Sequence, residues 1–229
     1  MKRSSSGTFY GPCMRANVYV DGFNLYYSAL RTRFPDCKWL DLNLLAATLF
    51  PTDTIQRVRY FTARISARPD DPQQVTRQQA YLRALAATGV HIHLGQFRHD
   101  RRYMRRAQAC ADPDCPSGST IEMLYTEEKG SDVNLATYLM RDAALKDCEL
   151  AIVLTNDTDL LEPIRLARAE FGVRVILLSP AERPSTTLLG SVDAVKKLRR
   201  GALQACQLPT NLRDPKGDIH RPRSWRPVP

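Results

Sequence analysis

The stretch Val18-Tyr19-Val20-Asp21-Gly22-Phe23-Asn24 decides the fold, because a short apolar run ends there in a carboxylate and a turn. Such a run is typical of a buried strand, and residues 25–33 can form the following helix, with Asn24 as its N-cap. Where strands alternate with helices, ligands bind at the carboxyl ends of the strands. We therefore expect Asp21 to lie at the ligand-binding edge of a parallel sheet.

The rest of the chain repeats this alternation of apolar runs and helical patterns. Helical spacing recurs after the acidic start at residues 70–72, over 132–146 and over 160–171. The five expected strands are residues 18–21, 58–65, 90–97, 150–155 and 173–178. This order predicts an α/β fold, a three-layer α/β/α sandwich around a central, mostly parallel five-stranded sheet. If the chain adds its first strands in one direction along the sheet and its later strands in the other, the first and fourth strands become neighbours, and Asp21 lies beside Asp157.

Three segments are expected along the chain. Residues 1–15 form a flexible N-terminal arm, and residues 16–200 form the domain, interrupted by a basic insert at about 98–120. Residues 201–229 form a Pro/Arg-rich C-terminal tail, and its end, from residue 207, is expected to be disordered. No apolar run is long enough to span a membrane, and the six cysteines do not follow a secreted-domain spacing. We therefore expect a cytoplasmic location.

The charge balance points to an anionic partner. The chain has 33 Lys and Arg against 24 Asp and Glu, a formal net charge of +9. A basic protein favours polyanions, of which nucleic acid is the commonest, although a solvated basic surface is the simpler alternative.

Two more acidic clusters fall where helices begin or strands end. They are Glu127-Glu128-Lys129-Gly130-Ser131-Asp132 and Thr155-Asn156-Asp157-Thr158-Asp159. Each could be only a turn or a helix cap, but several carboxylates at one edge would repel one another without a divalent cation. The candidate metal-binding residues are Asp21, Asp132, Asp157 and Asp159, and Asn24 could support them by orienting a bound water or a phosphate. Lys129 is a candidate phosphate-binding residue, Thr155 and Thr158 could orient a carboxylate or donate to a phosphate, and the roles of Glu127 and Glu128 stay open.

These blocks carry a family resemblance. Val20-Asp21-Gly22-Phe23-Asn24, the Glu128–Asp132 block and Thr155–Asp159 resemble the signature blocks of NYN-domain proteins, which belong to the PIN-like nuclease superfamily, with the LabA-like branch most similar. The resemblance covers about residues 16–200. It implies a Rossmann-like fold and cleavage of RNA that depends on Mg²⁺ or Mn²⁺, with catalytic roles for the four aspartates. Asn156 departs from the pattern, since many relatives have Gly there.

The basic insert is a candidate substrate arm. Arg98, Arg101, Arg102, Arg105 and Arg106 surround Tyr103, and arginine and aromatic rings together bind phosphates and stack on bases. A solvated charged loop is the alternative. Cys110 and Cys115 have a spacing found in some zinc loops, but a structural zinc usually needs four ligands, so zinc is not expected.

Three functions fit the sequence. The first is a metal-dependent endoribonuclease acting on single-stranded or structured RNA. The second is a non-catalytic RNA-binding module, and the third is a DNA nuclease of the flap-processing kind. A homodimer is plausible on base rates alone.

Overall fold

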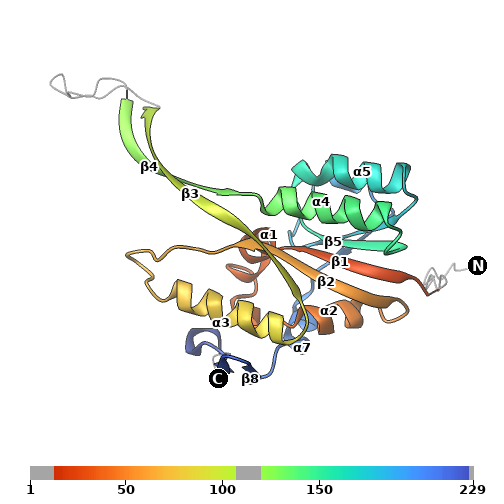
Figure 1. Ribbon diagram of the computed structural model, residues 1–229, viewed down its shortest axis with the longest axis horizontal. Helices are drawn as coiled ribbons and strands as arrows, with labels where there is room; N and C mark the ends of the chain where they lie inside the picture. The colour runs from red at the N-terminus through yellow and green to blue at the C-terminus, as the bar shows by residue number, and fades with distance from the viewer. Residues whose placement is uncertain (1–12, 107–119, 227–229) are drawn as a thin grey trace, which may run out of the picture.

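A seven-stranded sheet divides the protein into two helical layers (Figure 1). The computed structural model describes residues 13–106 and 120–226. The strand order is β4-β3-β2-β1-β5-β6-β7, and every neighbouring pair is parallel except β3 and β4. The strands are β1 Arg15–Asp21, β2 Thr54–Ala63, β3 His91–Arg105, β4 Thr120–Lys129, β5 Leu150–Leu154, β6 Arg174–Ser179 and β7 Ala194–Lys197.

Helices cover both faces of the sheet, as the alternating pattern predicts. In Figure 1, α4 and α5 lie on one face and α2, α3 and α7 on the other. The main helices are α2 Leu42–Leu49, α3 Gln74–Ala87, α4 Ser131–Ala144, α5 Leu161–Ala169 and α7 Arg200–Ala205. Shorter ones are α1 Gly22–Leu25, η1 Tyr26–Leu30, η2 Pro35–Cys37, η3 Thr158–Leu160, α6 Thr186–Leu189 and η4 Arg223–Trp225. The predicted three-layer α/β fold is therefore confirmed, and β1 and β5 are central neighbours.

The number of strands differs from the predicted five. β7 is a short edge strand, Ala-Val-Lys-Lys, that lacks the apolar run of a buried strand. β4 pairs antiparallel with β3, from Gln96 opposite Lys129 to Arg105 opposite Thr120. The described part of the predicted basic insert lies mostly in β3, which forms with β4 a two-stranded arm that projects from the body (Figure 1). Most residues of its outer part are exposed, so its strands show no apolar pattern that a sequence can reveal.

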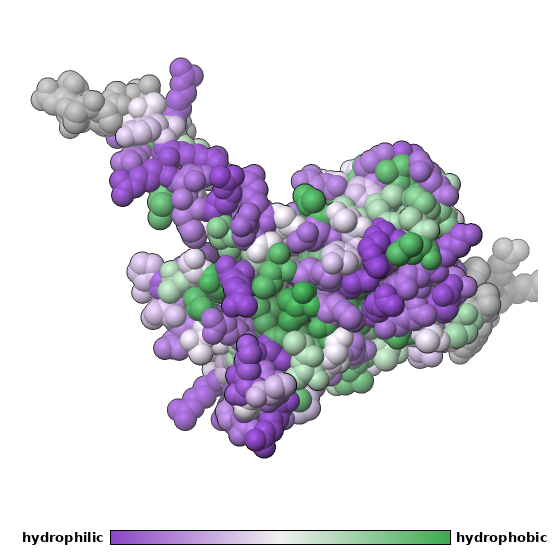
Figure 2. Space-filling model, in the orientation of Figure 1, coloured by the Kyte–Doolittle hydropathy of each residue, from purple (hydrophilic) through white to green (hydrophobic). Residues whose placement is uncertain are grey.

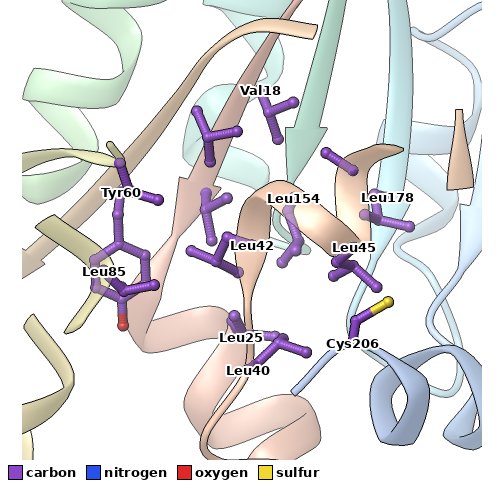
Figure 3. Close-up of a cluster of buried hydrophobic side chains, with 14 of the residues drawn as sticks. Val18, Leu25, Leu40, Leu42, Leu45, Tyr60, Leu85, Leu154, Leu178 and Cys206 are labelled. Atoms are coloured by element: carbon purple, nitrogen blue, oxygen red, sulfur yellow. The ribbon is translucent and has the colours of Figure 1, made fainter. Parts of the chain in front are cut away.

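Two apolar cores follow from the side-chain alternation of the strands. Val18 and Val20 of β1 face the α2 and α3 side, whereas Tyr19 faces α4 and α5. In Figure 3, leucines of the central strands meet Leu42 and Leu45 of α2. Burial of each such side chain contributes about 1.5–3 kcal/mol. The cores therefore hold the carboxyl ends of β1 and β5 rigidly beside each other.

The start of the first helix was predicted wrongly. Asp21, not Asn24, is the N-cap of α1, because its Oδ1 accepts a hydrogen bond of 2.9 Å from the Asn24 N–H. The helix continues as a π-helical turn over Tyr26–Leu30. Segments of this kind are frequent at functional sites.

The prediction of a disordered tail was also wrong. β8 Asn211–Asp214 and β9 Gly217–His220 form a hairpin, and the Trp225 ring lies 6.3 Å from that of Trp39. Arg83 of α3 also donates two hydrogen bonds to the Asp214 carboxylate. Composition predicted disorder, but Leu208 and Ile219 are buried in the apolar core, and the Trp225 ring and the Arg83–Asp214 pair add to the contacts that hold this segment on the domain.

The ends of the predicted domain are only partly described. Residues 1–12 of the predicted N-terminal arm lie outside the described residues, and Arg15 already belongs to β1. The division of the chain at residues 15 and 200 stays a prediction. Among the described helices, none is long and apolar enough to cross a membrane.

Candidate metal centre

Three aspartates meet at the carboxyl edge of the sheet. Asp21 ends β1, Asp157 follows β5, and Asp132 lies in the first turn of α4. One carboxylate oxygen of each lies within 4.8 Å of the others. Such a spacing suits hard oxygen ligands around one divalent cation.

Asp21 is the buried member of this group. Its side chain accepts hydrogen bonds from the Asn24 N–H at 2.9 Å and from the Thr155 hydroxyl at 3.0 Å. Burial nevertheless raises its pKa to about 6, and the charge of Asp157 adds to this increase against the lowering effect of the hydrogen bonds. The carboxylate is therefore held in one orientation while its charge is poorly compensated.

Asp132 is placed by the turn between β4 and α4. Gly130 has a φ of +97°, which glycine adopts without steric cost. Glu128 then accepts hydrogen bonds from the N–H of Ser131 at 3.1 Å and from its hydroxyl at 2.7 Å, so it fixes the first turn of the helix. The pKa of Asp132 is raised to about 6. Burial is the largest cause, and the charges of Asp21, Asp157, Glu128 and Asp159 raise it further.

The loop after β5 is held by its own hydroxyl and amide groups. The Thr155 hydroxyl accepts a hydrogen bond from the Asp157 N–H at 3.1 Å, and Asp157 Oδ1 accepts one from the Asp159 N–H at 3.0 Å. Thr155 is fully buried, so it orients Asp21 and Asp157 from beneath. Asp159 and Thr158 are exposed, and Asp159 is not one of the three converging carboxylates.

Two asparagines join this loop to its neighbours. Asn24 Oδ1 accepts a hydrogen bond from the Asn156 N–H at 3.1 Å, and Asn156 Oδ1 accepts one from the Ser185 N–H at 2.7 Å. Asn156, which departs from the family pattern, therefore links the metal-centre loop to the segment before α6. Sequence reasoning missed this link, because its partners are set by the fold. It also missed the capping role of Glu128, which the three-residue spacing to Ser131 could have indicated.

The remaining predicted substrate residues lie along the arm. Arg98, Arg101, Arg102, Tyr103 and Arg105 belong to β3 and are exposed, and Lys129 Nζ donates to Glu127 at 2.7 Å. Arg102 lies 4.1 Å from the ring centre of Tyr125 and 3.6 Å from acidic oxygens of Asp100 and Glu127. Figure 2 shows mostly hydrophilic side chains on the projecting part of the arm.

Arg106 follows β3 and is half-buried. Cys110 and Cys115 lie outside the described residues.

A groove of about 910 Å³ begins beside the metal centre. Gly22 and Phe23, which directly follow Asp21, form part of its wall. It continues between η1, the segment after β2 and the base of the arm. Other aromatic lining residues are Tyr26, Tyr27, Tyr60, Tyr81, Phe97 and Trp225.

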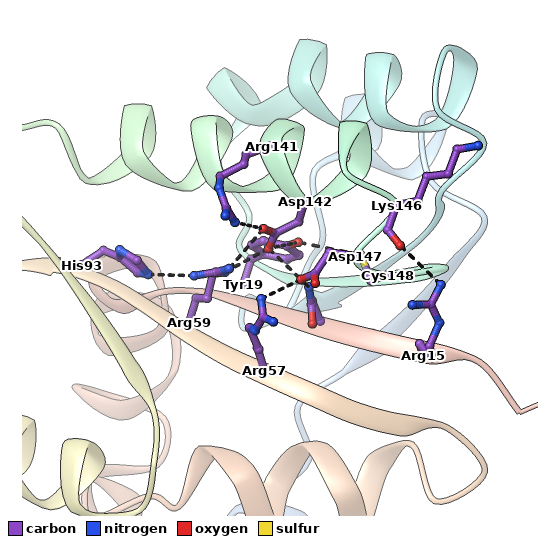
Figure 4. Close-up of polar contacts among 11 residues, drawn as sticks. Arg15, Tyr19, Arg57, Arg59, His93, Arg141, Asp142, Lys146, Asp147 and Cys148 are labelled. Atoms are coloured by element: carbon purple, nitrogen blue, oxygen red, sulfur yellow. Dashed lines mark hydrogen bonds and ion pairs between the residues drawn. The ribbon is translucent and has the colours of Figure 1, made fainter.

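A buried polar network anchors the far end of α4 (Figure 4). Asp142 is fully buried and accepts hydrogen bonds from Arg59 at 3.0 and 3.1 Å and from the Tyr19 hydroxyl at 2.9 Å. Asn17 extends the network to Asp147, which pairs with Arg57 at 2.8 Å. Because Asp132 and Asp142 lie on one helix, this network also fixes the orientation of the metal-centre end of α4.

Comparisons with known proteins agree with this architecture. The chain is 28% identical to 6-hydroxy-3-succinoylpyridine 3-monooxygenase HspA of Pseudomonas putida, over 93% of this chain and 75% of that protein. A crystal structure of a protein of unknown function from Vibrio parahaemolyticus is similar in fold, with a TM-score of 0.52 at 17% identity. The structural match covers 82% of this chain and 94% of the Vibrio parahaemolyticus protein chain. The family model of the NYN domain matches residues 15–197. The chain therefore belongs to the NYN domain family, part of the PIN-like nuclease superfamily.

Proposed function

We propose that this protein is an endoribonuclease that hydrolyses RNA phosphodiester bonds with Mg²⁺ or Mn²⁺. The observation that carries the proposal is the convergence of Asp21, Asp132 and Asp157 in a NYN domain. Burial raises the pKa of Asp21 and of Asp132 to about 6, and the charges of neighbouring carboxylates add to the increase. A divalent cation would compensate these poorly solvated negative charges.

The chain's own residues orient the reaction. Asp21, Asp132 and Asp157 would hold the cation, and Asp159 at the exposed edge of the loop would add negative charge or a further ligand. Thr155 holds Asp21, and Asn24 holds the loop that carries Asp157. When bound there, the cation supplies Lewis-acid polarisation of the phosphate and lowers the pKa of a nearby water molecule.

Substrate binding is assigned to the positive charges around this centre. Arg98, Arg101, Arg102 and Arg105 on the arm, together with Arg106, Tyr103, Lys129 and the exposed Thr158, would contact phosphates and bases.

The free thiols of the buried Cys37, Cys148 and Cys206 suit a reducing cytoplasm.

The test is cleavage of a labelled single-stranded RNA by the purified protein in Mn²⁺, Mg²⁺ or EDTA, with a DNA oligonucleotide of the same sequence in parallel. Cleavage of RNA that requires metal and is lost in Asp21→Asn supports the proposal. Cleavage of DNA alone would assign a DNA nuclease. RNA binding at low salt without turnover in either metal would assign a non-catalytic binding module.

A second candidate function is hydroxylation of a pyridine-type ring. It is favoured by the name of the Pseudomonas putida relative and by the aromatic groove beside the carboxylates. Incubation with 6-hydroxy-3-succinoylpyridine, O₂ and a nicotinamide reductant, followed by product analysis, tests it. No conversion of the pyridine under these conditions would exclude this substrate.

A further inference from the structure

The groove beside the metal centre combines aromatic rings with cations. The Phe23 ring lies 6.4 Å from that of Tyr27 in a nearly parallel stack, and 5.7 Å from Phe97 in an edge-on arrangement. Tyr26 is 36% exposed and Tyr27 is 45% exposed. Large aromatic side chains are therefore open to a ligand along one wall of the groove.

Positive charges lie against these exposed rings. The Arg31 guanidinium lies 5.5 Å from the ring centre of Tyr27, and Lys38 Nζ lies 5.9 Å from that of Tyr26. Burial lowers the pKa of Lys38, and the nearby charges of Arg77 and Arg31 lower it further, so these cations repel one another. An anionic ligand would relieve that repulsion.

The opposite wall of the groove has charges of both signs. Arg68 and Arg77 line it together with Asp70 and Asp71, and Asp71 is paired with Arg77. With Arg31 and Lys38 included, cationic side chains outnumber acidic ones in the lining. The groove as a whole therefore favours an anion that also offers flat ring surfaces.

The geometry points to the unpaired bases of a single-stranded RNA, stacked on Tyr27 and Phe23 while their phosphates face Arg31 and Lys38. This inference rests on the proposed function, because the strand would extend from a phosphate at the metal centre. Gly22 and Phe23, which line the groove, follow Asp21 directly, so one end of the groove lies next to the residue that ends β1. Aromatic rings beside a positive groove are the usual way to bind single strands without reading their sequence. A duplex keeps its base faces stacked internally and cannot use these rings.

The test uses a single-stranded RNA carrying 2-aminopurine, whose fluorescence falls when the base stacks on an aromatic ring. It is titrated in EDTA, so that binding is measured without cleavage. The variants are Tyr27→Ala, Tyr27→Phe as the conservative replacement, and Phe171→Ala as the matched control. Phe171 is 38% exposed and is not among the groove residues.

We expect binding to the wild-type protein to quench the fluorescence. Tyr27→Ala should weaken binding about 5- to 150-fold and reduce the quenching, as for loss of one stacking platform. Tyr27→Phe and Phe171→Ala should behave as the wild type, and circular dichroism of Tyr27→Ala should be unchanged. Duplex RNA should not compete efficiently.

Wild-type quenching and affinity in Tyr27→Ala would overturn the inference even if the protein cleaves RNA. Equal competition by duplex RNA would also overturn the inference. Displacement of the strand by nicotinate at a similar concentration would overturn it too, and would assign the groove to a small heteroaromatic acid. Loss of quenching in Tyr27→Ala in a protein that cleaves nothing would support the base site and count against the nuclease proposal alone.

Discussion

The Thr155 hydroxyl donates a hydrogen bond of 3.0 Å to Oδ2 of Asp21, across a separation of 134 residues. Asp21 ends β1 and Thr155 directly follows the neighbouring strand β5, and both residues are buried. The bond orients the Asp21 carboxylate without neutralising it, since the pKa of Asp21 is still raised to about 6. The carboxylate is thus held in one orientation without any cation, although burial disfavours its charge.

Asp21→Asn should abolish cleavage while leaving the protein at least as stable without metal. The Oδ1 of asparagine can still accept the hydrogen bond from the Asn24 N–H, and its side-chain NH2 can donate to the Thr155 hydroxyl oxygen, while the substitution removes a charge that burial disfavours. Metal-dependent cleavage and thermal unfolding in EDTA measure the two effects. A lower melting temperature in EDTA would contradict this account of Asp21.

Metal binding should strengthen as the pH rises from 5 to 7. Asp21 and Asp132 have folded-state pKa values of about 6, above the ordinary 3.8. Without metal, the contribution of these two groups to the free energy of unfolding is fully present below about pH 4, where both are protonated, and is lost as the pH rises through 6. With Mn²⁺, the stabilisation should instead grow over that range, because the cation competes with protons.

The measurement for this pH effect is the melting temperature at several pH values, with Mn²⁺ or EDTA. Burial and the charge of Arg59 lower the pKa of His93 to about 4, so its titration changes the stability of the fold with pH in the direction opposite to that of the two aspartates. The matched control is therefore the double variant Asp21→Asn/Asp132→Asn, which keeps His93. If wild type and double variant respond alike to pH and Mn²⁺, the two carboxyl groups are not the source.

Asp142→Ala should destabilise the fold by about 3–5 kcal/mol, because it leaves Arg59 buried without its partner. Urea unfolding measures the change. Glu162→Gln is the control, since its pair with Arg165 lies on the exposed surface of α5 and should matter little. Similar effects of the two substitutions would show that the buried network does not anchor α4.

Gly95→Ala should disturb the start of α4 and weaken metal binding. A Cβ at this position would lie 2.6 Å from the Lys129 carbonyl oxygen and 3.0 Å from the Ser131 nitrogen, so the backbone before Asp132 must shift. We expect a loss of about 1–3 kcal/mol in stability. Gly201→Ala in α7 is the matched control, since nothing lies within 4 Å of its added Cβ. Equal metal affinity in both variants would contradict the close packing of Gly95.

Arg105→Ala should lower the salt dependence of RNA binding by about one unit in the slope of log K against log salt, as for loss of one phosphate contact. Arg165→Ala is the control, because Arg165 lies on α5 and pairs with Glu162. Binding without metal at several salt concentrations measures both. An unchanged slope for Arg105→Ala would remove this residue from the proposed substrate arm.

Local sequence patterns were sufficient to predict the layers and the neighbouring placement of β1 and β5. Each buried strand carries its own apolar run, and each acid follows a strand or begins a helix, so Asp21, Asp132 and Asp157 could be placed at one edge by packing rules alone. The N-cap of α1, the paired arm and the packed C-terminal segment were missed. Exposed strands leave no apolar pattern, and a few apolar residues, here Leu208, Ile219 and Trp225, can hold a segment whose average composition indicates disorder.

The sequence by itself determined the fold class and placed Asp21, Asp132 and Asp157 at one edge, because both depend on periodicity and on the order of strands. It also placed Asp159 in this group, and the structure leaves Asp159 outside it. Only the tertiary structure decided the link through Asn156, the network around Asp142 and the aromatic groove. These features join residues far apart in the chain, and their partners are chosen by the packing of elements rather than by any spacing along the sequence.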